Sequence, residues 1–165
     1  MPWTPNANEP SAVFEEPIIN NTLAIIERDF KNALDYFYAS DRLPDFKERA
    51  LGQIRDLAFP TLAITPRVND TEEAADRSHI VEACTLDIYL GVKGSSANEV
   101  TRLIMKYVRV MDAILRTARA DFFTDMSNPF GVVLQIRHSY GPVGSKETQY
   151  FRAAIVELTV NLRER

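Results

Sequence analysis

Cysteine and histidine are scarce in this sequence. A single cysteine, Cys84, rules out an internal disulfide. It falls in phase with an apolar strand face, which favours a buried small residue over a nucleophile. The two histidines, His79 and His138, stand in no recognisable catalytic or zinc-binding spacing. We therefore expect no catalytic residue, no metal site and no cofactor.

Long apolar runs and a basic start are also missing. No stretch of about 18 apolar residues is present, so we expect no membrane span. The opening residues MPWTPNANEP lack the basic and apolar regions of a secretory signal, so we expect a cytoplasmic location. The acidic run at 70–76 lacks the spacing of an EF-hand, which favours a solvated loop over a cation site.

Positive charge is in deficit, with a net charge of -4 and a pI of about 5.2. This balance excludes a nucleic-acid footprint over the whole chain and leaves a local basic stripe open. The 165 residues are 45% hydrophobic, enough to build the core of one domain. We expect an extended arm at 1–16 and a single domain over 17–165.

The arm holds three prolines and the only tryptophan, Trp3. Trp3 either packs loosely on its own chain or anchors a neighbouring molecule, because aromatic residues bury much area at low entropic cost. Apolar residues then recur every three or four positions, which predicts a helix from Pro17 to near Ala39. A second, shorter helix is predicted to begin at Pro44, with Phe46, Ala50, Ile54 and Leu57 on one side.

The next segment reads as a strand at 57–66, although Pro60 and Pro66 lie within it. Proline cannot donate to a sheet ladder, so this strand is predicted to lie at an edge. A long hairpin loop is expected to follow at 67–79. Residues 80–92 alternate between apolar and mixed positions, which predicts a strand with one core face.

A capping box, Ser96 to Glu99, precedes the clearest amphipathic pattern of the chain and predicts a helix over 97–121. Another side of this segment is basic and either lies in solvent or contacts an acidic partner or a nucleic-acid backbone. With the preceding turn, its cations are Lys93, Arg102, Lys106, Arg109 and Arg116. The Gly91-Val92-Lys93-Gly94 turn matches a G-x-x-G pattern, which we interpret as a strand-to-helix turn with a surface lysine.

Strands are predicted at 130–140 and 150–162, joined by a turn-rich loop. Loop lengths suggest that the first two strands pair with each other, as do the last two. The sequence thus predicts an α+β fold: a mainly antiparallel four-stranded sheet of ββαββ order, helices packed on one face and N-terminal helices preceding the sheet.

This order of elements resembles the tail terminator proteins, also called tail-completion or neck proteins, of tailed bacteriophages. The resemblance covers about residues 17–163 and is one of pattern and organisation. The stretches that carry it are FPTLAITP with the acidic loop after it, VEACTLDIYLGV, NEVTRLIMKYVRVMDAIL and YFRAAIVELTVNLRER.

The resemblance implies a non-enzymatic virion protein in the tail or neck, assembled in the cytoplasm of a bacterial host. Such proteins form rings, commonly hexameric, at the head-proximal end of the tail tube. They end tube growth and join the tail to the head connector, and DNA passes through the ring without sequence-specific binding. The implied partners are copies of the chain, tail-tube proteins and head-connector proteins, with no membrane.

A ring would cover the proline-bearing edge, and we predict a subunit interface that includes the two-sided apolar start of the last strand. Its candidate residues are Trp3, Phe59, Pro60, Phe151, Ala153 and Ile155. Two alternatives stay open: a monomer whose arm or first helix covers that face, and a small nucleic-acid-binding or regulatory module that uses the basic side. An enzyme of unknown type ranks third.

Overall fold

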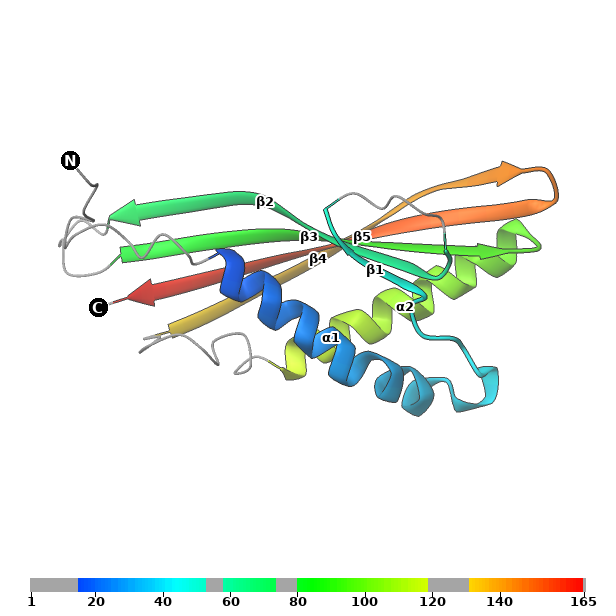
Figure 1. Ribbon diagram of the computed structural model, residues 1–165, viewed down its shortest axis with the longest axis horizontal. Helices are drawn as coiled ribbons and strands as arrows, with labels where there is room; N and C mark the ends of the chain where they lie inside the picture. Colours follow the sequence, from blue (N-terminus) through cyan, green and yellow to red (C-terminus); the bar gives the residue numbers. More distant parts are fainter. Residues whose placement is uncertain (1–14, 53–57, 74–79, 119–130, 165) are drawn as a thin grey trace.

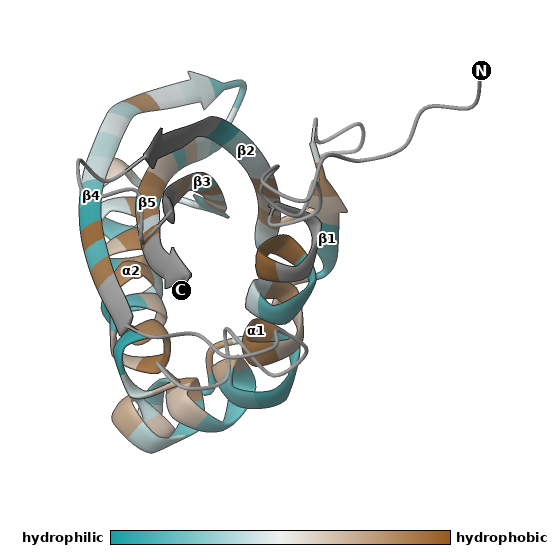
Figure 2. Ribbon diagram, turned by 90° about the vertical axis from the view of Figure 1, so that its left-hand side faces the viewer, coloured by the Kyte–Doolittle hydropathy of each residue, from teal (hydrophilic) through white to brown (hydrophobic). Residues whose placement is uncertain are grey.

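The computed structural model describes residues 15–52, 58–73, 80–118 and 131–164. They form two α-helices and five strands, with both helices against one face of a single sheet (Figure 1). The sheet bends around the helices, which close its open side (Figure 2). Within the described residues, no helix combines the length and apolar character needed to cross a membrane. The predicted arm at 1–16 lies almost entirely outside them.

Two helices form where the apolar periodicity predicts them. α1 spans Glu15–Phe37 and α2 spans Ala97–Thr117. Each buries one face made of residues three and four apart, because such residues share one side of a helix. The buried residues of α1 are Ile18, Thr22, Ile25, Ile26, Phe30 and Leu34. Those of α2 are Val100, Ile104, Tyr107, Val108, Val110, Met111, Ile114 and Leu115.

The five strands are β1 (Glu48–Leu51), β2 (Thr61–Glu73), β3 (Ile80–Gly94), β4 (Gly131–Lys146) and β5 (Gln149–Glu164). They lie in the order β1-β2-β3-β5-β4. The pairings of β2 with β3 and of β4 with β5 confirm the two predicted hairpins. All pairings are antiparallel except that of β1 with β2. The α+β class is therefore confirmed, whereas the predicted four-stranded antiparallel sheet is wrong: the sheet is mixed and has five strands.

The extra strand replaces the predicted second helix. The chain makes only a short 3-10 helix at Ala39–Asp41 and then enters β1. β1 pairs in parallel with Thr61–Ile64, and Gly52 N donates to Ile64 O at 2.8 Å just after it. Gly52 adopts a φ of 87°, a conformation that glycine accepts at low cost. The open edge of β2 offers these residues more backbone hydrogen bonds than an isolated short helix.

The position of β1 explains how a strand tolerates two prolines. Pro60 precedes β2, and its carbonyl accepts a hydrogen bond from Lys47 N at 2.8 Å. Pro66 follows the last β1–β2 pair, and the β2–β3 register shifts between Pro66 and Val68. Proline is tolerated at such an edge or bulge. The prediction of an edge strand is therefore wrong over Thr61–Ile64, because β1 of the same chain pairs with β2 there. A neighbouring subunit is not required to cover that stretch.

Both hairpins are longer than predicted. β2 continues to Glu73, through most of the expected acidic loop, and β4 continues to Lys146, through the expected glycine- and proline-rich loop. A register shift between Tyr140 and Val143 accommodates Gly141 and Pro142 within β4. A bulge of this kind lets turn residues remain inside a strand.

The core lies between the helices and the central strands β3 and β5. Alternate residues of both strands are buried, including Cys84, which confirms that its side chain packs in the core. β2, which pairs with β3, adds Leu62 and Ile64 to the core. Each buried aliphatic side chain of this kind contributes about 1.5–3 kcal/mol of transfer free energy.

An aromatic cluster fixes the connector between α1 and β1. The ring centroids of Phe30 and Phe46 lie 4.4 Å apart, and Tyr107 lies 5.6 Å from Phe30 and 5.5 Å from Phe46. The Tyr107 hydroxyl donates to Pro44 O. Burial, and to a lesser degree the charge of Asp45, raises the pKa of Tyr107 well above its ordinary value. The hydroxyl therefore stays protonated as a donor.

Replacement of Tyr107 by Phe should remove this hydrogen bond while keeping the ring. We expect a loss of about 1 kcal/mol in the free energy of unfolding, because the Pro44 carbonyl loses its partner. Urea unfolding followed by circular dichroism measures it. The control is Tyr36→Phe at a side chain that is 82% exposed, where stability should not change. Equal stability of Tyr107→Phe and the wild type would contradict the role of this bond.

Candidate functional site

The face of the sheet that points away from the helices carries an apolar patch. The ring centroids of Phe59 and Phe151 lie 5.3 Å apart. The two rings meet near Gly91 on β3, where a Cβ atom would lie 2.7 Å from Thr61 Cγ2 and 3.0 Å from Phe59 Cε1. The missing side chain of Gly91 therefore makes the space that Phe59 occupies.

Three further residues extend this patch along the same face. Tyr89 pairs with Ile155, and Gly91 pairs with Ala153. Their sequence neighbours Ile88, Leu90 and Ala154 are buried in the core, so Tyr89, Ala153 and Ile155 point the other way. The side chain of Tyr89 is 37% exposed. We call these residues the outer patch: Phe59, Tyr89, Gly91, Phe151, Ala153 and Ile155.

The predicted interface residues are thus largely brought together. Phe59, Phe151, Ala153 and Ile155 lie on one face, and the buried Pro60 directly follows Phe59. Trp3 lies outside the described residues. Sequence reasoning missed Tyr89, because the odd-numbered positions of its strand are chemically mixed. Only the alignment of β3 with β5 places Tyr89 beside Ile155.

A row of charged side chains borders the outer patch. Arg67 forms ion pairs with Asp87, at 3.4 Å, and with Glu157. Arg137 lies opposite Glu157 in the β4–β5 register. Arg67 is half exposed, so solvent screens its pair with Glu157, whereas Asp87 is buried. Next along the face, Thr85 and Thr159 share a hydrogen bond of 3.1 Å. The outer face therefore divides into an apolar half and a polar half.

Replacement of Gly91 by Ala tests the construction of the outer patch. The added methyl group would collide with Thr61 and Phe59, so we expect a loss of about 1–3 kcal/mol in the free energy of unfolding. The control is Gly144→Ala, where a Cβ atom meets nothing within 4 Å. Chemical denaturation of both variants provides the comparison. If Gly91→Ala were as stable as Gly144→Ala, the close contact with Phe59 would be wrong.

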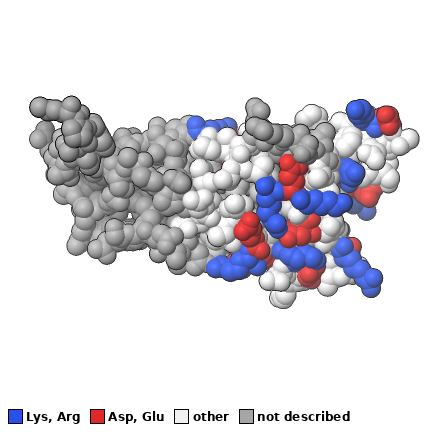
Figure 3. All heavy atoms as spheres, in the orientation of Figure 1, with Lys and Arg blue, Asp and Glu red and all other residues white. Residues whose placement is uncertain are grey.

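The predicted basic side of α2 is partly neutralised within the chain. Lys106 Nζ lies 2.5 Å from Asp41 Oδ2, and Arg116 Nε donates to Asp112 at 2.9 Å. The hydrogen bond between Arg116 and Asp112, reinforced by the charge of the carboxylate, raises the pKa of Arg116. On the face of the helices in Figure 3, Lys and Arg are interleaved with Asp and Glu.

Two other cations of this side have no carboxylate partner among the described residues. They are Arg102 and Arg109, both exposed. The guanidinium of Arg109 lies 5.7 Å from the ring centroid of Phe37. Four of the five predicted basic residues line two grooves, which share Arg102 and Lys106. Lys93, Arg102 and Lys106 line one groove, and Arg102, Lys106 and Arg109 line the other.

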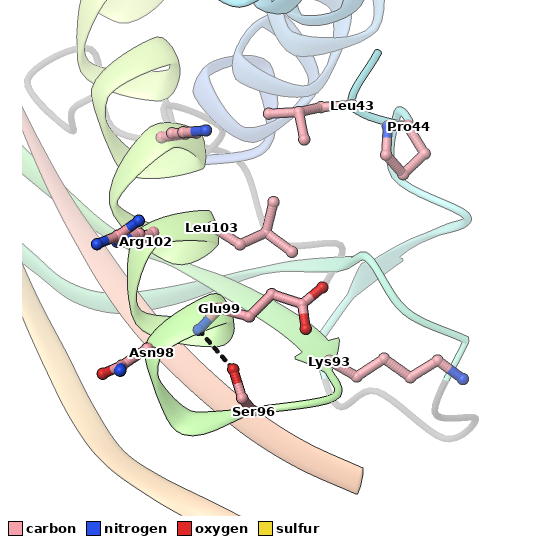
Figure 4. Close-up of a pocket in the computed structure, with 9 residues that line it drawn as sticks. Leu43, Pro44, Lys93, Ser96, Asn98, Glu99, Arg102 and Leu103 are labelled. Carbon is pink, nitrogen blue, oxygen red and sulfur yellow. Dashed lines mark hydrogen bonds between the residues drawn. The ribbon is translucent and has the colours of Figure 1, made fainter. Parts of the chain in front are cut away.

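The first groove lies beside the N-terminus of α2 and has a volume of about 610 Å³ (Figure 4). Leu103 of α2 points toward Leu43 and Pro44 of the connector, and Lys93 extends from the end of β3 (Figure 4). The N-cap belongs to the same region: Ser96 Oγ accepts from Glu99 N at 3.1 Å (Figure 4). The predicted N-cap is therefore confirmed.

The carboxylate of Glu99 reaches back past the N-cap, with its main partner at Ser95 and a smaller contribution from the backbone N–H of Ser96. Its Oε2 accepts from Ser95 N at 2.7 Å and from Ser95 Oγ at 2.6 Å, one residue before the cap. These bonds favour the charged carboxylate, and the side-chain bond from Ser95 is the main reason that the pKa of Glu99 is lowered. The negative charge also suits the N-terminus of a helix.

This lowered pKa predicts a pH dependence of stability. The folded state holds the pKa of Glu99 below its unfolded value of 4.5. The stability that the charged carboxylate contributes is therefore complete above pH 4.5 and is lost as pH falls through the folded pKa. Glu99→Gln should therefore be less stable than the wild type at neutral pH, and the difference should shrink below pH 4.5. Urea unfolding from pH 7 to pH 3 measures it. A difference that stays constant over this range would contradict the charge effect.

The second groove lies between α2 and β4 and has a volume of about 620 Å³. We call it the α2–β4 groove. It is lined by Tyr38, Arg102, Met105, Lys106, Val108, Arg109, Asp112, His138 and Tyr140. The rings of His138 and Tyr140 meet edge to face at 5.6 Å. The guanidinium of Arg152 lies 5.7 Å from the Tyr140 ring and donates to Gly141 O and Thr101 Oγ1.

His138 is the histidine that the described residues include, and nothing around it suggests chemistry. His138 is exposed in β4, and His79 lies outside the described residues. The part of the chain that the structure describes holds no group of three or more potential metal ligands. The G-x-x-G glycines, Gly91 and Gly94, are both in β3, as expected for a strand leading into a helix.

No protein-family model matches the chain, and no curated protein matches it. Among solved structures, one chain of the "Virion of native gene transfer agent (GTA) particle" is similar over 85% of this chain and 91% of its own. The sequence identity is 9% and the TM-score is 0.41. A likeness at this level assigns neither a family nor a function.

Proposed function

We propose that this chain is a structural virion protein of the tail terminator kind. It forms a homo-oligomeric ring at the head-proximal end of a tail tube, where it ends tube growth and joins the tail to the head connector. The role needs no catalytic residue, cofactor or metal ion, and DNA passes through the ring without sequence-specific binding. The order of its main elements, a helix, a hairpin, a long helix and a second hairpin, supports this proposal through the resemblance that the sequence carries.

The outer patch is the observation that carries the proposal. A sheet needs one face for its core, and both helices lie on that face. The other face nevertheless gathers Phe59, Tyr89, Phe151 and Ile155 from three separate segments. Aromatic and aliphatic side chains on an open sheet face are typical of a surface that a partner covers. In a ring, the partner is the neighbouring copy.

The alternative of a small nucleic-acid-binding module receives less support. Phosphate binding gains affinity from each cation that is free to displace counterions. Lys106 and Arg116 already face carboxylates of their own chain, which leaves Arg102, Arg109 and Lys93 for such contacts. Salt-dependent DNA binding that is lost in Arg102→Ala/Arg109→Ala would favour this alternative.

A charge placed in the outer patch should weaken assembly without unfolding the chain. We expect Tyr89→Asp and Ile155→Asp to raise the concentration for half-assembly at least tenfold, because each buries an unpaired carboxylate in the contact. Negative-stain electron microscopy and sedimentation velocity over a concentration series measure ring formation. Circular dichroism verifies that each variant folds.

The control is Leu51→Asp, which changes a side chain of β1 that is 56% exposed and lies outside the outer patch. It should assemble like the wild type. Closed rings formed equally well by Tyr89→Asp and Ile155→Asp would remove the outer patch from the contact. A wild-type chain that stays monomeric at every concentration would contradict the proposed function itself.

A further inference from the structure

We propose that the α2–β4 groove binds the acidic end of the β2–β3 hairpin of a second copy of this chain. The inference rests on the proposed function and deepens it, because it names a pair of surfaces that join one copy to the next. A head-to-tail contact requires two different surfaces on every chain. The groove and the hairpin end are such a pair.

The groove has the composition of a protein-binding surface. Aromatic residues, Met and Arg are enriched at the centres of interfaces, and this groove combines Tyr38, Met105, Arg109 and Tyr140. Met105 is 53% exposed and Tyr140 is 38% exposed, although both are apolar enough to pack in a core. Cation–π contacts hold two neighbouring rings in place: Arg109 over Phe37 and Arg152 over Tyr140.

The charge of the groove selects an acidic partner. Arg102 and Arg109 point to no carboxylate within ion-pair distance among the described residues. The acid that lines the groove, Asp112, is already paired with Arg116. Two guanidinium groups are therefore left for a ligand, and guanidinium binds carboxylates in a two-pronged geometry.

The far end of the sheet is acidic in its sequence. By sequence, the last residues of β2 and the paired ends of β3 and β5 carry five carboxylates and one guanidinium. These residues are Asp70, Glu72, Glu73, Glu82, Glu164 and Arg163. The end that bears them lies beyond both helices, at the left of Figure 1. Complementary charge thus makes another copy of the chain the best matched occupant of the groove.

The hairpin end cannot reach the groove of its own chain. In the sheet, His138 lies in the same row as Val156, Ile88 and Ile64. Glu73 is nine residues along β2 from that row, a separation of about 30 Å at the rise of an extended strand. Glu73 pairs with Ile80, which itself pairs with Glu164, so the strand is held in the sheet to its end. The contact must therefore form between molecules.

A reciprocal charge exchange tests this contact. One variant, Arg102→Glu/Arg109→Glu, reverses the groove, and a second, Glu72→Lys/Glu73→Lys, reverses the hairpin end. We expect each alone to need at least a tenfold higher concentration for half-assembly in sedimentation velocity. An equimolar mixture should assemble again, because alternating copies then place unlike charges in every contact. The fourfold variant, with both reversals in one chain, should also assemble.

The matched control is Lys47→Glu/Lys146→Glu, which makes the same change in net charge at two exposed lysines outside the groove. It should assemble like the wild type. If the reversed groove does not fold by circular dichroism, Arg102→Ala/Arg109→Ala takes its place, with a smaller loss expected.

The outcomes separate this inference from the proposed function. Wild-type rings together with unimpaired assembly of both reversed variants would overturn the inference and leave the proposed function standing. Impaired single variants without recovery in the mixture would also overturn it, because the two surfaces would then not face each other. A wild-type chain that never assembles would overturn both.

Discussion

The alternation of side chains along β3 and β5 is the constraint on which the rest of the molecule depends. Both strands have partners on each side, and both turn every second residue onto the helices. A shift of one residue in either strand would send the whole buried set to the other face, so the register is strongly fixed. The alternate residues of the two strands, among them Tyr89 and Ile155, are thereby held on the outer face and take no part in the core. Because the core does not constrain these outward-facing residues, they can be of types that contact other molecules.

Local patterns were sufficient to predict the elements that build this core. The spacing of Phe30 and Leu34 predicted α1, and the alternation around Leu86 and Leu158 predicted the two central strands and their faces. The Ser96 cap was predicted because its chemistry acts over three residues. In each case, the residues that define the pattern also make the decisive contacts.

The errors share a physical cause, which is pairing between distant segments. The local pattern at Glu48–Leu51 predicts a helix, because nothing local reveals that β2 leaves an edge open beside it. The composition of the acidic and glycine-rich stretches predicts loops, yet these stretches pair because their neighbours in the sheet are already aligned. The closeness of Phe59 and Phe151 depends on the empty side-chain position at Gly91, which carries no periodic signal. The α2–β4 groove likewise exists only once the pairing of β4 with β5 places His138 and Tyr140 beside the long helix.

The α2–β4 groove and the hairpin end are joined through one hydrogen-bonded sheet, and this has a consequence for assembly. His138 and the hairpin end at Glu73 are joined by continuous ladders through β5 and β3. The twist of the strands therefore fixes the angle between the groove and the hairpin end within each chain. Every added copy is then rotated by the same amount relative to the one before it. Repeated head-to-tail contacts with a constant rotation close into a ring when the rotation divides a full turn, and otherwise continue as a helix. Ring size is in this way a property of the sheet rather than of any single contact residue.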